Sequence, residues 1–97
     1  PITSETLIHE FTKSEQLEQE RIVEEVRQLL QRPGNRYFLW RLLDYCKAFV
    51  SISGTDPHSM AVYSGRRDAG LWVLNEIMSA DPDAFSMMTK EANDRSH

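Results

Sequence analysis

The amino-acid sequence predicts an all-α fold, a small bundle of three main helices followed by a short C-terminal helix. Three observations support this prediction. Apolar residues recur at spacings of three and four through much of the chain, and Asp-Pro pairs at 56–57 and 81–82 are typical helix starts. The strand-like run at 49–53 has no second strand to pair with, so we interpret it as an extended connector.

Length and composition indicate a single domain over residues 1–97. An apolar content of 40% with 27% charged residues is ordinary for a globular protein, and no apolar run approaches the ~20 residues of a membrane span. The formal net charge of -4 disfavours general affinity for nucleic acid. Cys46, the single cysteine, lies among apolar residues, so we expect a small core residue in a reducing compartment.

The first clear helix is predicted to begin at Ser14, a good N-cap, and to end near Arg32. Its apolar stripe consists of Leu17, Ile22, Val23, Val26, Leu29 and Leu30. Residues 3–11 have helix-compatible spacing but are few, so we expect residues 1–13 to form an N-terminal docking arm or a frayed first turn. The Pro-Gly-Asn sequence at 33–35 ends the helix and precedes the next one.

The second helix is predicted from Arg36 to about Val50, with Asn35 as its N-cap. It is apolar on most sides, which is typical of a central helix that neighbours bury on more than one face. Arg41 and Asp44 are three residues apart, and we expect them to pair with each other rather than with Asp68 and Arg67 across a helix interface.

The third helix is predicted from Pro57 to Ala80, capped by Asp56. It contains Gly65 and Gly70, and an interior glycine costs roughly 1 kcal/mol relative to alanine. Small residues in the first half of this helix would let another helix approach closely, so we expect the glycines to be present for a packing or functional reason.

The fourth helix is predicted to begin at Pro82, after the cap Asp81, and to end near Ala92. The polar residues 93–97 are expected to form a flexible tail. Both tryptophans, Trp40 and Trp72, are expected in the core rather than at an interface.

Catalytic chemistry is not indicated. His9, His58 and His97 are scattered, and neither an HExxH nor a CxxC motif is present, so we expect no metal site. The glycines of the third helix lack the lysine and the preceding strand of a phosphate-binding loop. We therefore expect no catalytic residue, no cofactor and no enzymatic activity.

Two groups of charged residues are candidates for partner binding. Arg66 and Arg67 are adjacent, and because neighbouring helical positions point about 100° apart, at most one can face inward while the other is free to bind a partner. Glu18, Glu24 and Glu25 lie on an acidic face of the first helix, which is either a solvated surface or a face that docks a basic partner or mimics nucleic acid.

Three sequence blocks resemble a small family of tailed-phage proteins first catalogued from a Bordetella phage. The blocks occupy residues 37–44, 63–71 and 81–85, with Met88 and Glu91 following, and the resemblance covers about residues 36–92. It implies a phage context, with genes near those for packaging and head proteins, and it implies no established activity.

Within that context we expect a non-enzymatic component of the virion or of its assembly, bound in several copies at the portal, the neck or the internal core. The alternative is an early regulator that binds and inhibits a host enzyme through its acidic first helix. The expected partners are phage structural proteins of the portal or neck region, a host protein, or further copies of the chain. Small molecules, membranes and nucleic acid are not expected partners. The expected location is the host cytoplasm during assembly, or the virion.

Overall fold

The computed structural model describes residues 3–49 and 56–96. In these two segments the chain forms four helices and no strand: α1 (Ser4–Leu29), α2 (Pro33–Tyr45), α3 (Pro57–Ala80) and α4 (Pro82–Arg95). The predicted all-α fold with four helices is therefore confirmed, although α4, with 14 residues, is not shorter than α2, with 13. Most of the expected connector at 49–53 lies outside the described residues.

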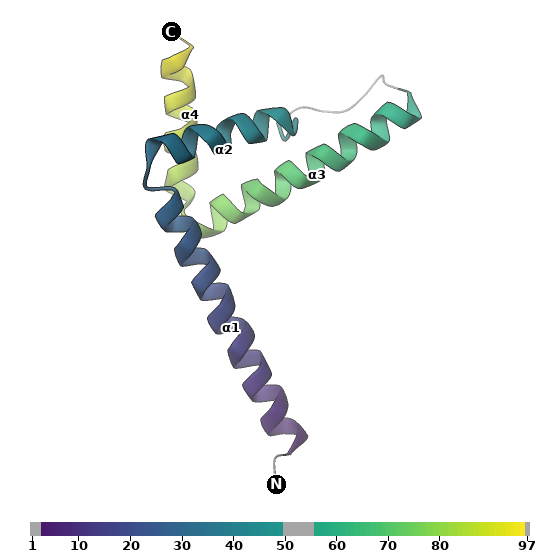
Figure 1. The fold of residues 1–97 in the computed structure, drawn as a ribbon, viewed down its shortest axis with the longest axis vertical. Coiled ribbons are helices and arrows are strands. Elements are labelled where there is room, and N and C mark those ends of the chain that lie inside the picture. The colour runs from purple at the N-terminus through teal and green to yellow at the C-terminus, as the bar shows by residue number, and fades with distance from the viewer. Residues whose placement is uncertain (1–2, 50–55, 97) are drawn as a thin grey trace.

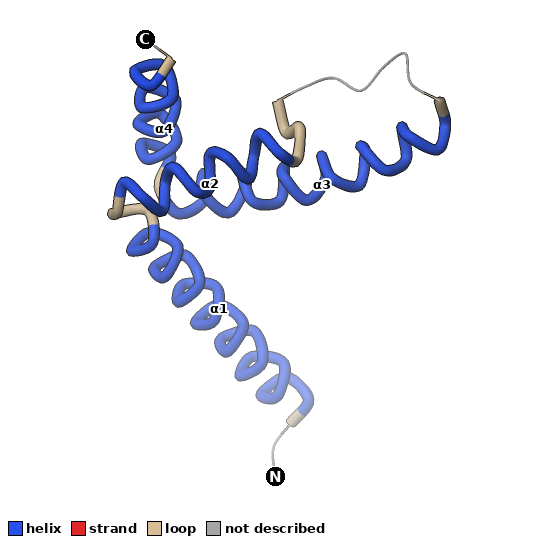
Figure 2. The backbone as a smooth tube through the Cα atoms, turned by 45° about the horizontal axis from the view of Figure 1, so that its top comes forward, coloured by secondary structure: helices blue, strands red, loops and turns tan. Residues whose placement is uncertain are grey.

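The helices are not arranged as a parallel bundle. Helices α2 and α3 lie side by side, α4 runs across one end of this pair, and α1 projects away from the same end (Figure 1). The second view shows the same separation of α1 from the other helices (Figure 2). The molecule measures 63 × 37 × 15 Å along its principal axes, so it is elongated and thin.

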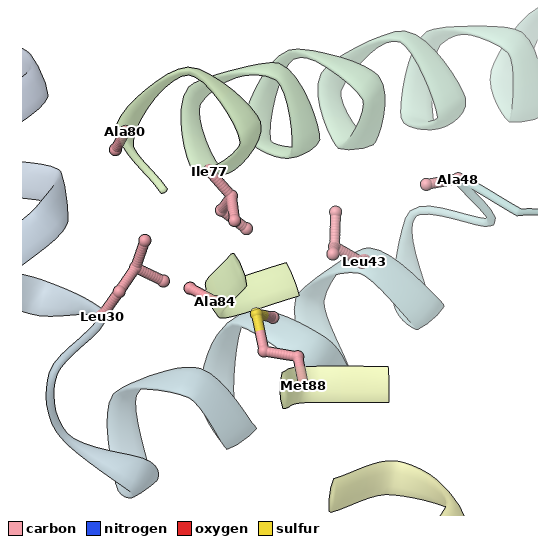
Figure 3. Packing of buried hydrophobic residues seen from close by; sticks show 7 residues of the cluster. All are labelled: Leu30, Leu43, Ala48, Ile77, Ala80, Ala84 and Met88. Carbon is pink, nitrogen blue, oxygen red and sulfur yellow. The ribbon is translucent and has the colours of Figure 1, made fainter. Parts of the chain in front are cut away.

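The core lies where the four helices meet. Its largest fully buried side chains are Leu30, Leu43, Ile77 and Met88, which come from all parts of this junction (Figure 3). Ala48, Ala80 and Ala84 complete the cluster. Small alanines allow the backbones to approach closely, so α4 can be held by few large side chains. Cys46 is also buried, as expected.

Helix α1 is longer than predicted. It begins at Ser4, and Thr3 is its N-cap, with the Thr3 hydroxyl accepting a 3.2 Å hydrogen bond from the backbone N–H of Thr6. Ser14 lies inside the helix, so its prediction as the N-cap was wrong. No glycine or proline occurs from Ser4 to Leu29, and an interior serine costs only a few tenths of a kcal/mol, so the helix continues through it.

Helix α2 begins and ends earlier than predicted. It starts at Pro33 rather than Arg36, because a proline is compatible with the first helical turn, where its missing N–H is not needed. Asn35 does not cap it. Its side-chain Nδ2 instead donates a 2.8 Å hydrogen bond to the carbonyl of Leu29, at the end of α1. The amide therefore stabilises the turn between the two helices.

The end of α2 is a Schellman motif rather than a continuation to Val50. Lys47 adopts a left-handed backbone with φ of 58°. The N–H of Ala48 bonds to the carbonyl of Leu43 at 3.1 Å, and that of Lys47 to the carbonyl of Asp44 at 3.0 Å. These bonds turn the chain and place Ala48 in the core.

Helices α3 and α4 begin where the sequence predicts. Asp56 accepts a 3.0 Å hydrogen bond from the N–H of Ser59, and Asp81 accepts one of 3.1 Å from the N–H of Asp83. Helix α4 continues to Arg95 instead of ending near Ala92, so the prediction of a flexible tail was wrong for residues 93–95.

The two glycines of α3 have different surroundings. A Cβ atom built on Gly70 would lie 2.7 Å from the Cβ of Cys46 and 3.1 Å from that of Ala48, whereas one built on Gly65 would have no neighbour within 4 Å. The packing reason expected for both glycines therefore holds for Gly70, where the chain after α2 crosses α3, and not for Gly65.

The two tryptophans also differ. Trp40 is half-buried against the core, and its ring centroid lies 5.6 Å from that of Phe49 and 6.4 Å from that of Phe85. Trp72 is 63% exposed, so its assignment to the core was wrong. Helix α3 turns its Ile77 face toward the core, and Trp72, five residues earlier, points about 140° away from that face.

Candidate functional site

The one buried charged side chain in the described segments has a structural role. Arg36 of α2 donates from Nε and Nη2 to the carboxylate of Glu91 in α4, at 2.9 and 3.1 Å, and from Nη1 to the carbonyl of Leu30 at 2.9 Å. The hydrogen bonds to Glu91 raise the pKa of Arg36, and those from Arg36 lower the pKa of Glu91, in both cases against an opposing effect of burial. Each of the three guanidinium nitrogens donates one of these hydrogen bonds, so the pair joins helices.

Depressions lined by described residues lie on the outside of one helix or between two helices. Two depressions lie along α1 alone, one of them lined by Phe11, Glu15 and Glu18, and a third lies between α2 and α4 beside Tyr37 and Arg41. The side of a single helix cannot enclose a small molecule, which normally requires a cleft that buries most of the ligand. In residues 3–49 and 56–96, no cluster of His, Cys, Asp or Glu is large enough to hold a metal ion.

The three predicted glutamates differ in their surroundings. Glu24 forms an ion pair with Arg27 at 2.6 Å, and Glu25 forms one with Arg21 at 3.2 Å. Both pairs are exposed and lie within α1, so they add little to stability. Glu18 is exposed, and no described residue forms an ion pair with it. Of the three carboxylates, Glu18 is thus the one that is not already neutralised by its own helix.

Arg66 and Arg67 face different ways. Arg66 is exposed, with its Cζ 5.2 Å from the ring centroid of Tyr45 and 5.9 Å from that of Tyr63. Arg67 is half-buried, and its Nε is buried without a hydrogen-bond partner among the described residues. Arg67 is therefore the inward-facing member, and Arg66 is the one that a partner can reach.

Arg41 does not pair with Asp44. Its guanidinium instead lies over the rings of Tyr37 and Phe38, at 4.9 and 5.8 Å from their centroids, and Arg95 of α4 lies 4.2 Å from the Tyr37 ring. A cation over an aromatic face gains about 0.5–1 kcal/mol at an exposed site. This attraction holds Arg41 along the outer face of α2.

Together these side chains form one exposed surface, which we call the arginine–aromatic stripe. Its members are Tyr37, Phe38, Arg41 and Tyr45 of α2, with Arg66 of α3 and Arg95 of α4. Three of its rings are 44–61% exposed. Sequence reasoning assigned α2 to the interior and missed this surface, although the spacing of Tyr37, Arg41 and Tyr45 by four residues already indicated one helix face.

A second exposed surface is the N-terminal part of α1, residues 4–20, which we call the arm. It extends beyond the helix junction, and Leu7, Ile8 and Phe11 on it are 54%, 64% and 66% exposed. The arm contains five glutamates and one lysine, a net charge of -4 that equals the charge of the whole chain. The remaining residues therefore sum to zero, and the acidic character of the protein resides in the arm.

None of the helices in the described segments is both long and apolar enough to cross a membrane.

These features define a small all-α protein whose candidate sites are exposed surfaces. The chain belongs to the Bbp19-like phage protein family, whose profile matches residues 26–90. This confirms the resemblance seen at residues 36–92 and extends it into the last turn of α1. The matched range contains α2, α3 and most of α4, and it leaves the arm outside. No curated protein and no solved structure matches the chain.

Proposed function

We propose that this phage protein is a non-enzymatic component of the virion or of its assembly, acting at the portal, the neck or the internal core. The observation that carries the proposal is the arm, with Leu7, Ile8 and Phe11 exposed to solvent. The arm extends from the junction of the four helices, which we call the body and which contains most of the family match. An apolar helix face of this kind is a common means of binding a groove on a partner protein.

The energetics of the arm support a binding role. Most helices in proteins are stabilised by packing of an apolar face, and isolated helices of fewer than about 12–15 residues are marginal in water. The arm receives no such packing from the described residues, because α1 contains no buried residue. A partner that covers Leu7, Ile8 and Phe11 would remove their apolar surface from water and stabilise the helix at the same time.

The body supports the same role. Its core and the Arg36–Glu91 pair hold α2 and α4 in fixed relative positions, so the exposed side chains of α2 are presented by a rigid scaffold. Tyrosine and arginine are the residue types that most often dominate the energy of protein–protein interfaces, and the arginine–aromatic stripe consists largely of them.

Quantitative mass spectrometry of purified phage particles and of assembly intermediates tests the proposal. We expect the protein at a fixed stoichiometry relative to the portal protein in one or both. A matched pair of phage variants, Phe11→Asp in the arm and Leu17→Asp on a different side of the arm, separates a specific contact from general loss of the protein. Absence of the protein from particles and intermediates alike would contradict the proposal.

The acidity of the arm favours one alternative, an early regulator that binds a basic surface of a host enzyme. Its net charge of -4 over 17 residues would accelerate association with such a surface and make it sensitive to salt. Affinity purification of the tagged protein early in infection distinguishes the two functions. A single host enzyme recovered at equal stoichiometry, and lost in the Phe11→Asp variant, would favour the regulator.

A further inference from the structure

We propose that the protein self-associates head to tail, with the arm of one copy bound to the arginine–aromatic stripe of the next copy. This inference rests on the proposed assembly function and names the partner of its two exposed surfaces. The two surfaces are different parts of the chain and both are exposed, so each copy can use both at once.

One face of the arm carries both apolar and acidic groups. Leu7, Phe11, Glu15 and Glu18 follow one another at spacings of four, four and three residues, which places them along the same side of the helix. The same face continues toward Val26, which packs on the core. The only basic residue of the arm, Lys13, lies on the opposite side. The arm face thus changes from apolar near its tip to acidic near the body.

The stripe offers groups that match this face. Its rings provide apolar surface for leucine and phenylalanine, and the guanidinium groups of Arg41, Arg66 and Arg95 provide donors for glutamate. Asp44 is the acidic neighbour of Arg41 along α2, and with it included the stripe still has a positive balance. Guanidinium groups already held over rings lose less conformational freedom on binding than mobile side chains do.

Charge decides between this pairing and a symmetric one. Two arms packed on each other would bring together two helices that each carry a net charge of -4, and like charges across an interface disfavour association. Two stripes packed on each other would likewise oppose three arginines to three arginines. An arm on a stripe opposes acidic and basic groups, so it is the electrostatically favoured pairing of these surfaces.

The contact must form between copies. Helix α1 has no glycine or proline from Ser4 to Leu29 that would act as a hinge, and its direction leads away from α2 (Figure 1). The arm therefore cannot fold back onto the stripe of its own chain. A contact between two different surfaces is heterologous, and its repetition yields a closed ring when the rotation closes and an open filament when it does not.

Molecular mass measurements on the purified full chain test the inference. We expect the wild-type protein to form species larger than a dimer in light scattering coupled to size exclusion. Phe11→Asp removes an apolar contact from the arm, and Arg41→Glu reverses a charge in the stripe. Each variant alone should associate at least thirtyfold more weakly, the equivalent of about 2 kcal/mol for an interface hot spot.

Mixing the two variants gives the sharpest test. Arg41→Glu retains an intact arm, and Phe11→Asp retains an intact stripe, so one intact contact can form between them and none can follow it. We expect an equimolar mixture to form a heterodimer whose mass is that of two chains. Neither a symmetric arm contact nor a symmetric stripe contact predicts recovery of association on mixing.

Two variants serve as matched controls. Leu17→Asp places the same substitution on the arm about 120° away from Phe11, and Lys90→Glu reverses a charge on α4 outside the stripe. Both should associate as the wild-type does. Thermal unfolding followed by circular dichroism establishes that every variant is folded, as expected for substitutions at exposed positions.

Three results on association would overturn the inference: a wild-type chain that is monomeric at its highest soluble concentration, loss of association in only one of the two variants, or no heterodimer on mixing. It would also be overturned if a monomeric wild-type chain bound single-stranded DNA through the stripe in a fluorescence titration. Presence of the protein in purified particles would still support the proposed function in each of these cases, because that measurement does not depend on self-association.

Discussion

Arg36 and Glu91, 55 residues apart in the sequence, form a two-point ion pair that joins α2 to α4. The Arg36 side chain is 10% exposed and that of Glu91 27%, and the remaining guanidinium nitrogen is bonded to the carbonyl of Leu30. The guanidinium thus connects three segments: the end of α1, α2 and α4.

Arg36→Met should lower the free energy of unfolding by about 2–4 kcal/mol, because it leaves the Glu91 carboxylate and the Leu30 carbonyl without their donor. Urea denaturation monitored by circular dichroism measures the loss. The double variant with Glu91→Leu should recover part of it, since two apolar side chains leave no isolated charge. A loss below about 0.5 kcal/mol for Arg36→Met would show that the pair behaves as an ordinary surface ion pair.

Stability should decrease in acid. The pKa of Glu91 is lowered mainly by the hydrogen bonds from Arg36, and that of Asp56 mainly by the bond from the backbone N–H of Ser59. A carboxyl group whose pKa is lower in the folded state stabilises the fold fully above its unfolded pKa of about 4, and this contribution is lost as the pH falls through the folded pKa.

Urea denaturation at a series of pH values from neutral to acidic checks this prediction. Glu91→Gln should reduce the pH dependence below about pH 4 and leave a smaller slope from the other carboxyl groups. An unchanged slope in this variant would contradict the role of the pair in acid sensitivity.

Alanine substitutions at the two glycines of α3 should have opposite effects. Gly70→Ala introduces a Cβ atom 2.7 Å from that of Cys46, and the resulting displacement should cost about 1–3 kcal/mol, more than the gain in helix propensity. Gly65→Ala meets no neighbour and should stabilise by roughly 0.5–1 kcal/mol. Midpoints of thermal unfolding compare the two variants directly, and a stabilising Gly70→Ala would refute the close approach of the chain after α2.

Substitution of the smaller residue, Ile77, should destabilise the protein more than substitution of the larger one, Trp72. Trp72→Gln removes a ring that is 63% exposed and should change stability by less than about 1 kcal/mol. Ile77→Ala opens a cavity at a side chain that is 1% exposed and should cost about 2–5 kcal/mol. Fluorescence provides a second check, because iodide quenches the emission of an exposed tryptophan, and the Trp72→Gln variant, which retains the half-buried Trp40, should be quenched less than the wild type.

Alanine substitutions at the adjacent arginines should separate stability from binding. Arg67→Ala removes a half-buried aliphatic stem and should lower the free energy of unfolding by about 1 kcal/mol without affecting self-association. Arg66→Ala acts at an exposed position and should leave stability within about 0.5 kcal/mol while weakening self-association. Equal and large losses of stability in both variants would remove the basis for a binding role of Arg66.

Features that depend on neighbours along the chain could be predicted from the sequence. The starts of α3 and α4 are correct because Asp56 and Asp81 act on backbone N–H groups two or three residues away. Ser14 also has a side-chain oxygen that could accept such a bond, yet it does not cap a helix. A residue of this type acts as a cap only where the preceding chain leaves the helix. Nothing before Ser14 forces it to do so.

The candidate surfaces were predictable only in part. Arg66 and Glu18 were among the predicted binding residues and are exposed, while Glu24 and Glu25 pair within α1 and Arg67 turns inward. The exposed aromatic face of α2 was missed, because a helix that is apolar on most sides was interpreted as one that its neighbours surround.

The sequence by itself therefore determined the helical class, the starts of two helices and the phage family, since all of these follow from residue types at short range. Only the tertiary structure decided which sides of the helices are covered. The Arg36–Glu91 pair, the contact of Gly70 with the chain after α2, and the exposure of Trp72 and of the arm depend on helices that meet from distant parts of the chain. A helix pattern specifies which residues share a face, and the packing of its neighbours determines whether that face is core or surface.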